Sequence, residues 1–309
     1  MRRPILVTGS HRSGTTWVGR MLCASREAGY VHEPFNPNRS PGWFPDPLPY
    51  WFMYVTEENA APYEAAVEDL LAFRYPVLAS LKRSRRPADL ARQVPEIARS
   101  TLYRAQRRRT LVKDPMALFS AEWLARRFGM EVVVMIRHPA AFVGSIKKLN
   151  WGFDYERNWL AHELLMRDHL AVRAESFGGY EGEVDLVGEG IVMWNAMYDL
   201  VARYRERHPE WHFVRYEDLA RDPVPGFRDL YGALGLRWDD DVRAKIERSS
   251  SAANVKEVPR WRRRATKRDS RAAARTWARR LTPAEVYRIR TEVADVAGAY
   301  YDESDWGPA

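Results

Sequence analysis

Residues 4–17 read PILVTGSHRSGTTW: a short apolar run, a loop between two glycines, and the start of an amphipathic pattern. The run at 4–9 ends in glycine and is typical of a buried strand. After the loop, apolar residues recur at helical spacing, namely Trp17, Val18, Met21 and Leu22. This stretch predicts a strand, a tight loop and a helix, in that order.

The loop has the composition of an anion-binding site. Gly9 and Gly14 have the G-x4-G spacing of nucleotide-binding loops, whose amides and following helix N-terminus converge on a phosphate. A nucleoside triphosphatase carries lysine after the second glycine, but this chain has Thr15 there, and its nearby cation is Arg12. We therefore expect a site for a phosphate-like group other than Mg–ATP. A simple glycine turn is the structural alternative.

A second basic element follows the apolar run EVVVMI at 131–136, which predicts a buried strand. Arg137 ends this strand, at the sheet edge where α/β proteins bind ligands. Pro139 opens a helix, and Ser145 lies two turns into it, so both side chains are expected at one rim. Together they could hold a second phosphate. The alternative is a surface salt bridge and a solvent-facing serine.

The remaining patterns predict an α/β fold with a central, mainly parallel sheet flanked by helices, in a single domain spanning 1–309. Residues 34–54 hold six prolines and many aromatic residues, which indicates a long ordered loop. Residues 252–275 are basic and lack apolar periodicity, so we expect a mobile or ligand-ordered segment there. Further elements are expected as strands at 109–113 and 211–216, and as helices at 119–128, after Asp222-Pro223, and after a capping box at Thr282–Glu285.

Composition narrows the class of protein. The 309 residues are 46% hydrophobic and 29% charged, which is ordinary for a soluble globular protein. No apolar run is long enough for a membrane span, no secretory signal is evident, and Cys23 is the only cysteine, so a cytoplasmic location is expected. The net charge is +8, and only seven of the 49 basic residues are lysine. Such an arginine excess reflects either genome composition or anionic ligands.

Two motifs together resemble those of sulfotransferases that use 3′-phosphoadenosine-5′-phosphosulfate (PAPS). They are RSGTTW at 12–17 and an arginine followed eight residues later by serine, here Arg137 and Ser145. The similarity extends over VKDPMALF (112–119), VRYEDL (214–219) and residues 268–285. The resemblance implies a P-loop-kinase-like fold and metal-independent sulfuryl transfer from PAPS to a hydroxyl, with adenosine 3′,5′-bisphosphate (PAP) as product.

The resemblance also implies roles for individual residues. Arg12 would contact the sulfuryl group and stabilise the leaving phosphate, and Trp17 would stack on adenine unless it is a helix core residue. A C-terminal family motif, aligned on Trp277, has lost its glycines here and leaves Arg271 as a candidate 3′-phosphate ligand. The expected 5′-phosphate ligands are Ser13, Gly14, Thr15 and Thr16, and the expected 3′-phosphate ligands are Arg137 and Ser145.

The segment His32-Glu33-Pro34-Phe35 resembles that of carbohydrate-directed and bacterial members, which use glutamate as the base where many cytosolic members use histidine. We expect Glu33 to be the base, with His32 and Asp114 as alternatives. The acceptor is expected to be a glycan, a glycolipid or another small metabolite. Aromatic residues that either wall its pocket or pack the core are Trp43, Phe44, Tyr50, Trp51, Phe52, Tyr54, Trp151, Phe153, Tyr155 and Trp159.

Two other classes of protein fit parts of the sequence. A small-molecule kinase with a degenerate loop would require Mg–ATP, which the missing loop lysine disfavours. A non-enzymatic nucleic-acid-binding protein would use residues 260–280, which carry ten Lys or Arg and one acidic residue. No nucleic-acid motif accompanies that charge, so we expect no nucleic-acid partner. The sequence predicts no oligomeric state.

Overall fold

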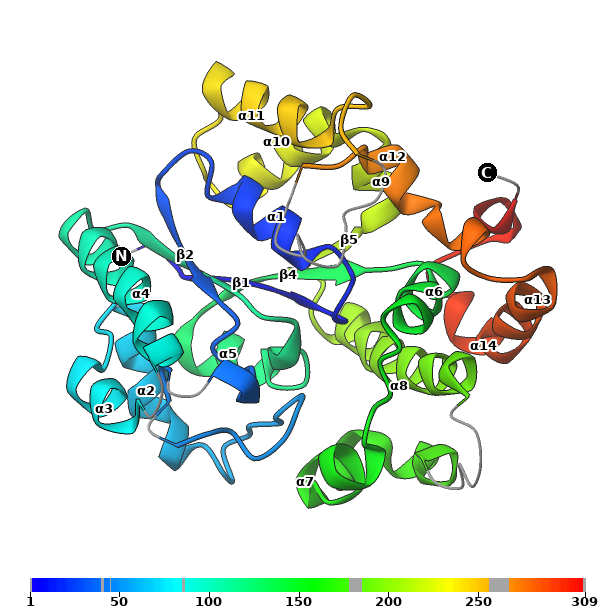
Figure 1. Ribbon diagram of the computed structural model, residues 1–309, viewed down its shortest axis with the longest axis horizontal. Helices are drawn as coiled ribbons and strands as arrows, with labels where there is room; N and C mark the ends of the chain where they lie inside the picture. The colour runs from blue at the N-terminus through cyan, green and yellow to red at the C-terminus, as the bar shows by residue number, and fades with distance from the viewer. Residues whose placement is uncertain are drawn as a thin grey trace.

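The computed structural model describes residues 2–39, 42–44, 46–84, 87–177, 185–255 and 267–307. Its centre is a five-stranded sheet in the order β2-β3-β1-β4-β5, and all four strand pairings are parallel (Figure 1). This confirms the expected α/β class with a mainly parallel sheet. The strands are β1 (Ile5–Gly9), β2 (Ala28–His32), β3 (Arg109–Lys113), β4 (Glu131–Ile136) and β5 (His212–Arg215).

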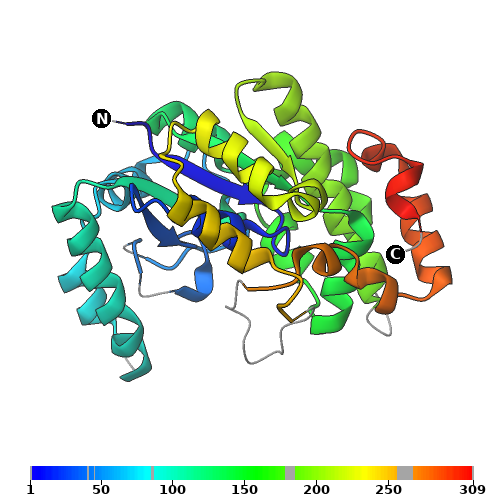
Figure 2. The same cartoon turned by 90° about the horizontal axis from the view of Figure 1, so that it is seen from above.

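Helices cover both faces of the sheet, which gives three layers (Figures 1 and 2). Ile5 and Val7 of β1 pack into one apolar cluster, with α1, α10 and α11, whereas Leu6 packs into the other, with α6 and α8. This alternation follows from the two-residue period of a strand buried on both sides. The longer helices are α1 (Thr15–Leu22), α2 (Ala61–Leu71), α4 (Pro87–Ala105), α5 (Ala121–Phe128), α6 (Pro139–Leu149), α8 (Leu186–Arg207), α10 (Pro223–Ala233), α11 (Asp240–Ser250) and α13 (Pro283–Glu292).

Most predicted elements are present. The strands at 109–113 and 131–136 have the expected bounds, the strand at 211–216 is one residue shorter at each end, and the helix at 119–128 begins at Ala121. The capping box at Thr282 and Glu285 forms with both of its hydrogen bonds. After the box, apolar residues recur at helical spacing as far as Tyr300, namely Val286, Ile289, Val293, Val296 and Tyr300, a pattern that predicts one helix. The structure instead breaks this helix at Val293, between α13 and the short helix α14 (Ala294–Ala297).

The two irregular stretches differ in outcome. Residues 34–54, of which 40, 41 and 45 lie outside the described part, form a loop with only a short 3-10 turn at Pro37–Arg39. In the stretch 252–275, Ser270–Ala274 form the short helix α12, capped by the side chain of Asp269, and residues 256–266 lie outside the described part. Among the described residues, no helix is both long and apolar enough to cross a membrane.

Candidate active site

The carboxyl ends of β1, β3 and β4 open into a cavity of about 290 Å³. Residues 11, 12 and 14–17, which follow β1, line it together with Arg137 and Ser145 from the end of β4 and from α6. The two motifs singled out in the sequence therefore lie on one cavity wall. Five cations face one acid there: Arg12, Arg137, Lys148, Arg268 and Arg280 against Glu33. Such a lining attracts anions.

The loop after β1 has a backbone that ordinary residues adopt only at a cost. Gly14 has φ 93°, and a Cβ atom at this position would collide with the ring of Tyr216. Arg12 also has a positive φ, 66°. The loop therefore makes a tight bend that aims the N-terminus of α1 at the cavity, and the first amides of that helix have no partner within the helix. The predicted strand, loop and helix are confirmed.

Arg12 connects the two motifs directly. Its Nε atom donates a hydrogen bond to the Ser145 hydroxyl over 2.9 Å. A second link runs through Tyr198 of α8, whose hydroxyl accepts from the backbone N–H of Arg137 and bonds the Ser10 hydroxyl, both at 2.8 Å. The buried Tyr198 thus fixes the loop against the end of β4. Nothing local in the sequence relates Tyr198 to the loop, so its role could not be predicted from the sequence.

Arg137 is almost completely buried at the end of β4. Its guanidinium lies over the Tyr216 ring at 3.9 Å and ion-pairs with Glu217 at 3.5 Å. Its Nη2 atom donates to the carbonyl of Ala273 at 3.1 Å. These contacts hold the planar fork of the guanidinium in one orientation. Arg137 is thus a cavity residue rather than a surface salt-bridge residue.

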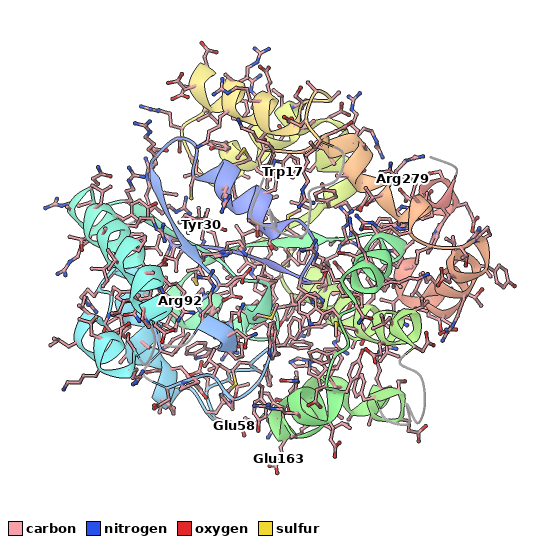
Figure 3. All side chains as sticks on the ribbon, viewed as in Figure 1. Trp17, Tyr30, Glu58, Arg92, Glu163 and Arg279 are labelled. Carbon is pink, nitrogen blue, oxygen red and sulfur yellow. The ribbon has the colours of Figure 1, made fainter. Side chains whose placement is uncertain are left out.

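Trp17 projects from α1 (Figure 3). Its side chain both packs against its neighbours and lines the cavity. Its ring meets Phe227 and Tyr216 edge-on, with centroid distances of 5.1 and 5.8 Å. Its Nε1 atom donates to the Ser249 hydroxyl at 3.1 Å. Trp17 can therefore pack against the core and also form part of the cavity wall.

Arg271 lies apart from the other predicted site residues. It does not line the cavity, its side chain is 72% exposed, and its Nε atom donates to the carbonyl of Arg221 at 2.8 Å. Neighbouring cations from the same part of the chain, Arg268 and Arg280, line the cavity instead. Ser13 is also absent from the lining: its hydroxyl is buried and donates to the Ser10 carbonyl at 2.5 Å.

Glu33 follows β2 and contributes the one carboxylate of the cavity lining. It forms an ion pair with Lys113, whose side chain is fully buried, and it accepts from Asn36 Nδ2 at 3.0 Å. The backbone N–H of Glu33 donates to the Lys113 carbonyl at 2.8 Å. Burial alone would raise the pKa of Glu33, but the positive charge of Lys113 holds it well below the ordinary value. Glu33 is therefore ionised at neutral pH.

The other two candidate bases face elsewhere. Asp114 is completely buried, and its carboxylate accepts from the backbone N–H groups of Phe35 and Met116 at 2.5 and 2.8 Å. Burial, and then the charge of Glu33, raise the pKa of Asp114 to about 7. His32 bonds the Tyr30 hydroxyl at 3.2 Å and lines a second cavity of about 30 Å³ behind Glu33. Only Glu33 of the three lines both cavities.

Most of the predicted aromatic residues pack the core. Trp43, Phe44, Phe52, Tyr54, Tyr155 and Trp159 are buried in the larger apolar cluster. Trp51 and Trp151 line the cavity, and their rings meet edge-on with centroids 5.9 Å apart. These two rings give one side of the cavity an apolar wall.

Within the described residues, no group of three or more His, Cys, Asp or Glu side chains could hold a metal ion. The cations and amides of the cavity instead suit a ligand that carries several negative charges. These residues therefore fit a nucleotide with phosphate groups at two positions.

Comparisons with known proteins were made for the whole chain. No curated protein matches the chain. Three similar solved structures are sulfotransferase STF9 from Mycobacterium avium (16% identity, TM-score 0.45, covering 98% of this chain and 78% of that one), the sulfotransferase domain of the olefin synthase from Synechococcus PCC 7002 (16%, 0.46, 98% and 97%), and mouse sulfotransferase SULT7A1 complexed with PAP (14%, 0.44, 96% and 84%).

A match to a family profile shows to which family the chain belongs. Residues 4–240 match the profile described as the sulfotransferase family. This range includes both motifs that line the cavity and the proposed base, and it covers well over half of the chain. The chain therefore belongs to the sulfotransferase family.

Proposed function

We propose that this protein transfers the sulfuryl group of PAPS to an acceptor hydroxyl. One observation carries the proposal: the loop after β1 and the Arg137/Ser145 pair line the same cationic cavity, with a carboxylate on its wall. A ligand with a 5′-phosphosulfate and a 3′-phosphate needs two such anion sites on one surface. The likeness of both motifs to those of PAPS-dependent enzymes supports the same assignment.

In this proposal the loop and the helix after it bind the 5′ end. The amides of Gly14, Thr15 and Thr16 would hold the 5′-phosphate at the N-terminus of α1. The Arg12 guanidinium would contact the sulfuryl oxygens and stabilise the charge that develops on the leaving phosphate oxygen. Ser13 would act through its backbone and through the loop bend that its hydroxyl stabilises.

Arg137 and Ser145 would hold the 3′-phosphate, with the Arg137 fork oriented by Tyr216 and Glu217. Trp17 would lie against the adenine as part of the cavity wall. Arg271 would contribute to 3′-phosphate binding only as an outer, exposed positive charge, because its side chain donates a hydrogen bond to the carbonyl of Arg221. Arg268 and Arg280 are better placed to reach a bound nucleotide.

Glu33 would accept the proton of the acceptor hydroxyl. The acceptor oxygen then forms a bond to sulfur, the bond from sulfur to the 5′-phosphate oxygen breaks, and the electron pair stays on that oxygen, which gives PAP. Lys113 would keep Glu33 ionised and fixed in place. Trp51 and Trp151 would contact the acceptor, for which we propose a glycan, glycolipid or other small metabolite with an apolar face beside its hydroxyl.

We further propose that the chain is one sulfotransferase domain, since residues from His11 to Arg280 line the same cavity. Its single cysteine suits a reducing, cytoplasmic location. The proposed reaction requires no metal ion.

Isothermal titration tests the nucleotide assignment. We expect PAP to bind at least about tenfold more tightly than adenosine 5′-monophosphate, because the 3′-phosphate adds charge-assisted hydrogen bonds. Tighter binding of Mg–ATP than of PAP would contradict the proposal and favour a kinase. Transfer of labelled sulfate from PAPS to a panel of sugars, phenols and glycolipids would then identify the acceptor class.

A further inference from the structure

Helices α3 (Val77–Arg83) and α4 form a hairpin at the margin of the molecule, beside β2 (Figures 1 and 2). The two helices are joined by buried polar side chains. The Ser80 hydroxyl donates to Gln93 Oε1 at 2.6 Å, and Gln93 Nε2 donates to the Ser84 hydroxyl at 2.8 Å. Because polar groups occupy the contact between the helices, several apolar side chains of the hairpin remain in water.

Exposed apolar side chains gather on this hairpin. Eight large apolar side chains of the described residues are exposed, and five of them belong to α3 and α4: Leu78, Leu81, Leu90, Val94 and Leu102. Leu78 is 77% exposed and Val94 is 62% exposed. Leu78 and Leu81 are three residues apart, and Leu90 and Val94 are four apart, so each pair lies on one face of its helix. Such gathering on one motif indicates an interaction surface.

The same part of the chain is basic. Residues 77–105, which span the hairpin, contain seven Lys or Arg and two acidic residues, a net charge of +5. The two acids, Asp89 and Glu96, are each paired with an arginine of their own helix, at 3.5 and 2.5 Å. No residue of this segment lines the cavity at the carboxyl ends of β1, β3 and β4.

We propose that the α3–α4 hairpin docks on an anionic lipid surface. A helix pair with exposed leucine and valine side chains and an excess of arginine suits the boundary between lipid headgroups and acyl chains. A second copy of the hairpin is a poor partner, because two surfaces with this charge repel each other. A nucleic acid would be held by the arginines alone and would leave the apolar side chains unused.

The hairpin also borders the proposed base. Arg92, Gln93 and Glu96 of α4 line the small cavity that Glu33 also lines. Docking through this hairpin would therefore bring the acceptor side of the protein near a membrane, which suits an acceptor hydroxyl carried on a lipid. This last step rests on the proposed function, whereas the binding of the hairpin to lipid does not.

Sedimentation with vesicles tests the proposal on the full chain. We expect the protein to pellet with vesicles of phosphatidylcholine that contain about one third phosphatidylserine, and to bind pure phosphatidylcholine far more weakly. Leu78→Glu with Val94→Glu should lower the partition coefficient at least about tenfold. Lys82→Glu with Arg104→Glu should do the same, and added salt should weaken binding of the wild type.

Matched variants on other surfaces serve as controls. Val172→Glu places the same change at a side chain that is 99% exposed elsewhere, and Arg228→Glu reverses an exposed charge on α10; both should bind like the wild type. Unchanged binding by the hairpin variants would overturn the proposal. So would a concentration-dependent dimer that Val94→Glu dissociates, or duplex binding that only the charge variants abolish. PAP titration is independent of all these measurements, so a failure here leaves the cavity assignment standing.

Discussion

Arg12 and Ser145 are 133 residues apart in the chain, and the Nε atom of Arg12 donates to the Ser145 hydroxyl over 2.9 Å. Each residue belongs to a different one of the two motifs that line the cavity, one after β1 and one on α6. The bond therefore makes the two motifs one structural unit even before a ligand binds. Ser145 thus contacts Arg12 directly, whereas the sequence predicts for it only a contact with the 3′-phosphate.

A double-mutant cycle tests this coupling. Ser145→Ala should weaken PAP binding about three- to tenfold, because it removes one hydrogen-bond partner of the ligand and of Arg12. Arg12→Ala should cost more, and the double variant should cost less than the two changes together, by about 0.5 kcal/mol or more. Isothermal titration measures all four proteins. Strict additivity would show that Arg12 and Ser145 act independently.

The pH dependence of turnover separates the candidate bases. Lys113 lowers the pKa of Glu33, so this carboxylate stays ionised as the pH falls through the range where an ordinary glutamate begins to protonate. Turnover that depends on Glu33 should therefore be flat between about pH 5 and pH 7. Turnover that depends on Asp114 should fall as the pH drops through about 7, because burial raises the pKa of Asp114 to that value.

Glu33→Gln should lower kcat about a hundredfold or more and leave PAP affinity unchanged.

Removing the partner of Glu33 should change the pH profile in a defined direction. In Lys113→Met the carboxylate keeps its burial, which raises its pKa, and loses the positive charge that lowers it. Protonation of Glu33 should then occur at higher pH, and the acidic limb of kcat should move upward by at least about one pH unit. An unchanged limb, together with unchanged PAP affinity, would show that Lys113 does not set the ionisation of Glu33.

Substitution of Gly14 should affect both stability and binding. Gly14→Ala must accommodate φ 93° and a collision with Tyr216, so it should lower the free energy of unfolding by about 2 kcal/mol or more and weaken PAP binding. Gly129→Ala is the matched control: its φ is 62°, and its Cβ would meet nothing within 4 Å. That variant should lose about 1 kcal/mol and bind PAP normally. Denaturant unfolding and titration measure the two effects.

The sequence predicts those parts of the fold that have a strong local signal. EVVVMI at 131–136 and RTLVK at 109–113 are apolar runs with polar ends, and both are strands with those bounds. The motif residues gather because the carboxyl ends of parallel strands meet at one edge of a sheet, which is a rule of topology and not of residue identity. The family likeness then adds roles that geometry alone does not distinguish.

The features that the sequence does not predict depend on contacts between residues far apart in the chain. Strand β2 has no strong local signal, because its residues AGYVH include a glycine and are partly exposed. Its strand conformation depends on pairing with β3, as in Tyr30 opposite Leu111. The ion pair of Lys113 with Glu33 and the link through Tyr198 each join distant positions, so no local spacing indicates them. The break at Val293 likewise lies within a continuous apolar pattern.

A comparison of two arginines tests which of them binds the 3′-phosphate. Arg137→Lys keeps the charge but loses the planar fork, the contact over Tyr216 and the bond to the Ala273 carbonyl, so PAP affinity should fall about tenfold or more. Binding of adenosine 5′-phosphosulfate, which lacks the 3′-phosphate, should fall much less. Arg271→Lys is the matched control, because Arg271 is exposed, lies outside the cavity and is bonded to the Arg221 carbonyl; PAP affinity should change less than about twofold. A large loss in Arg271→Lys would instead indicate that the segment around α12 moves onto the bound nucleotide and brings Arg271 with it.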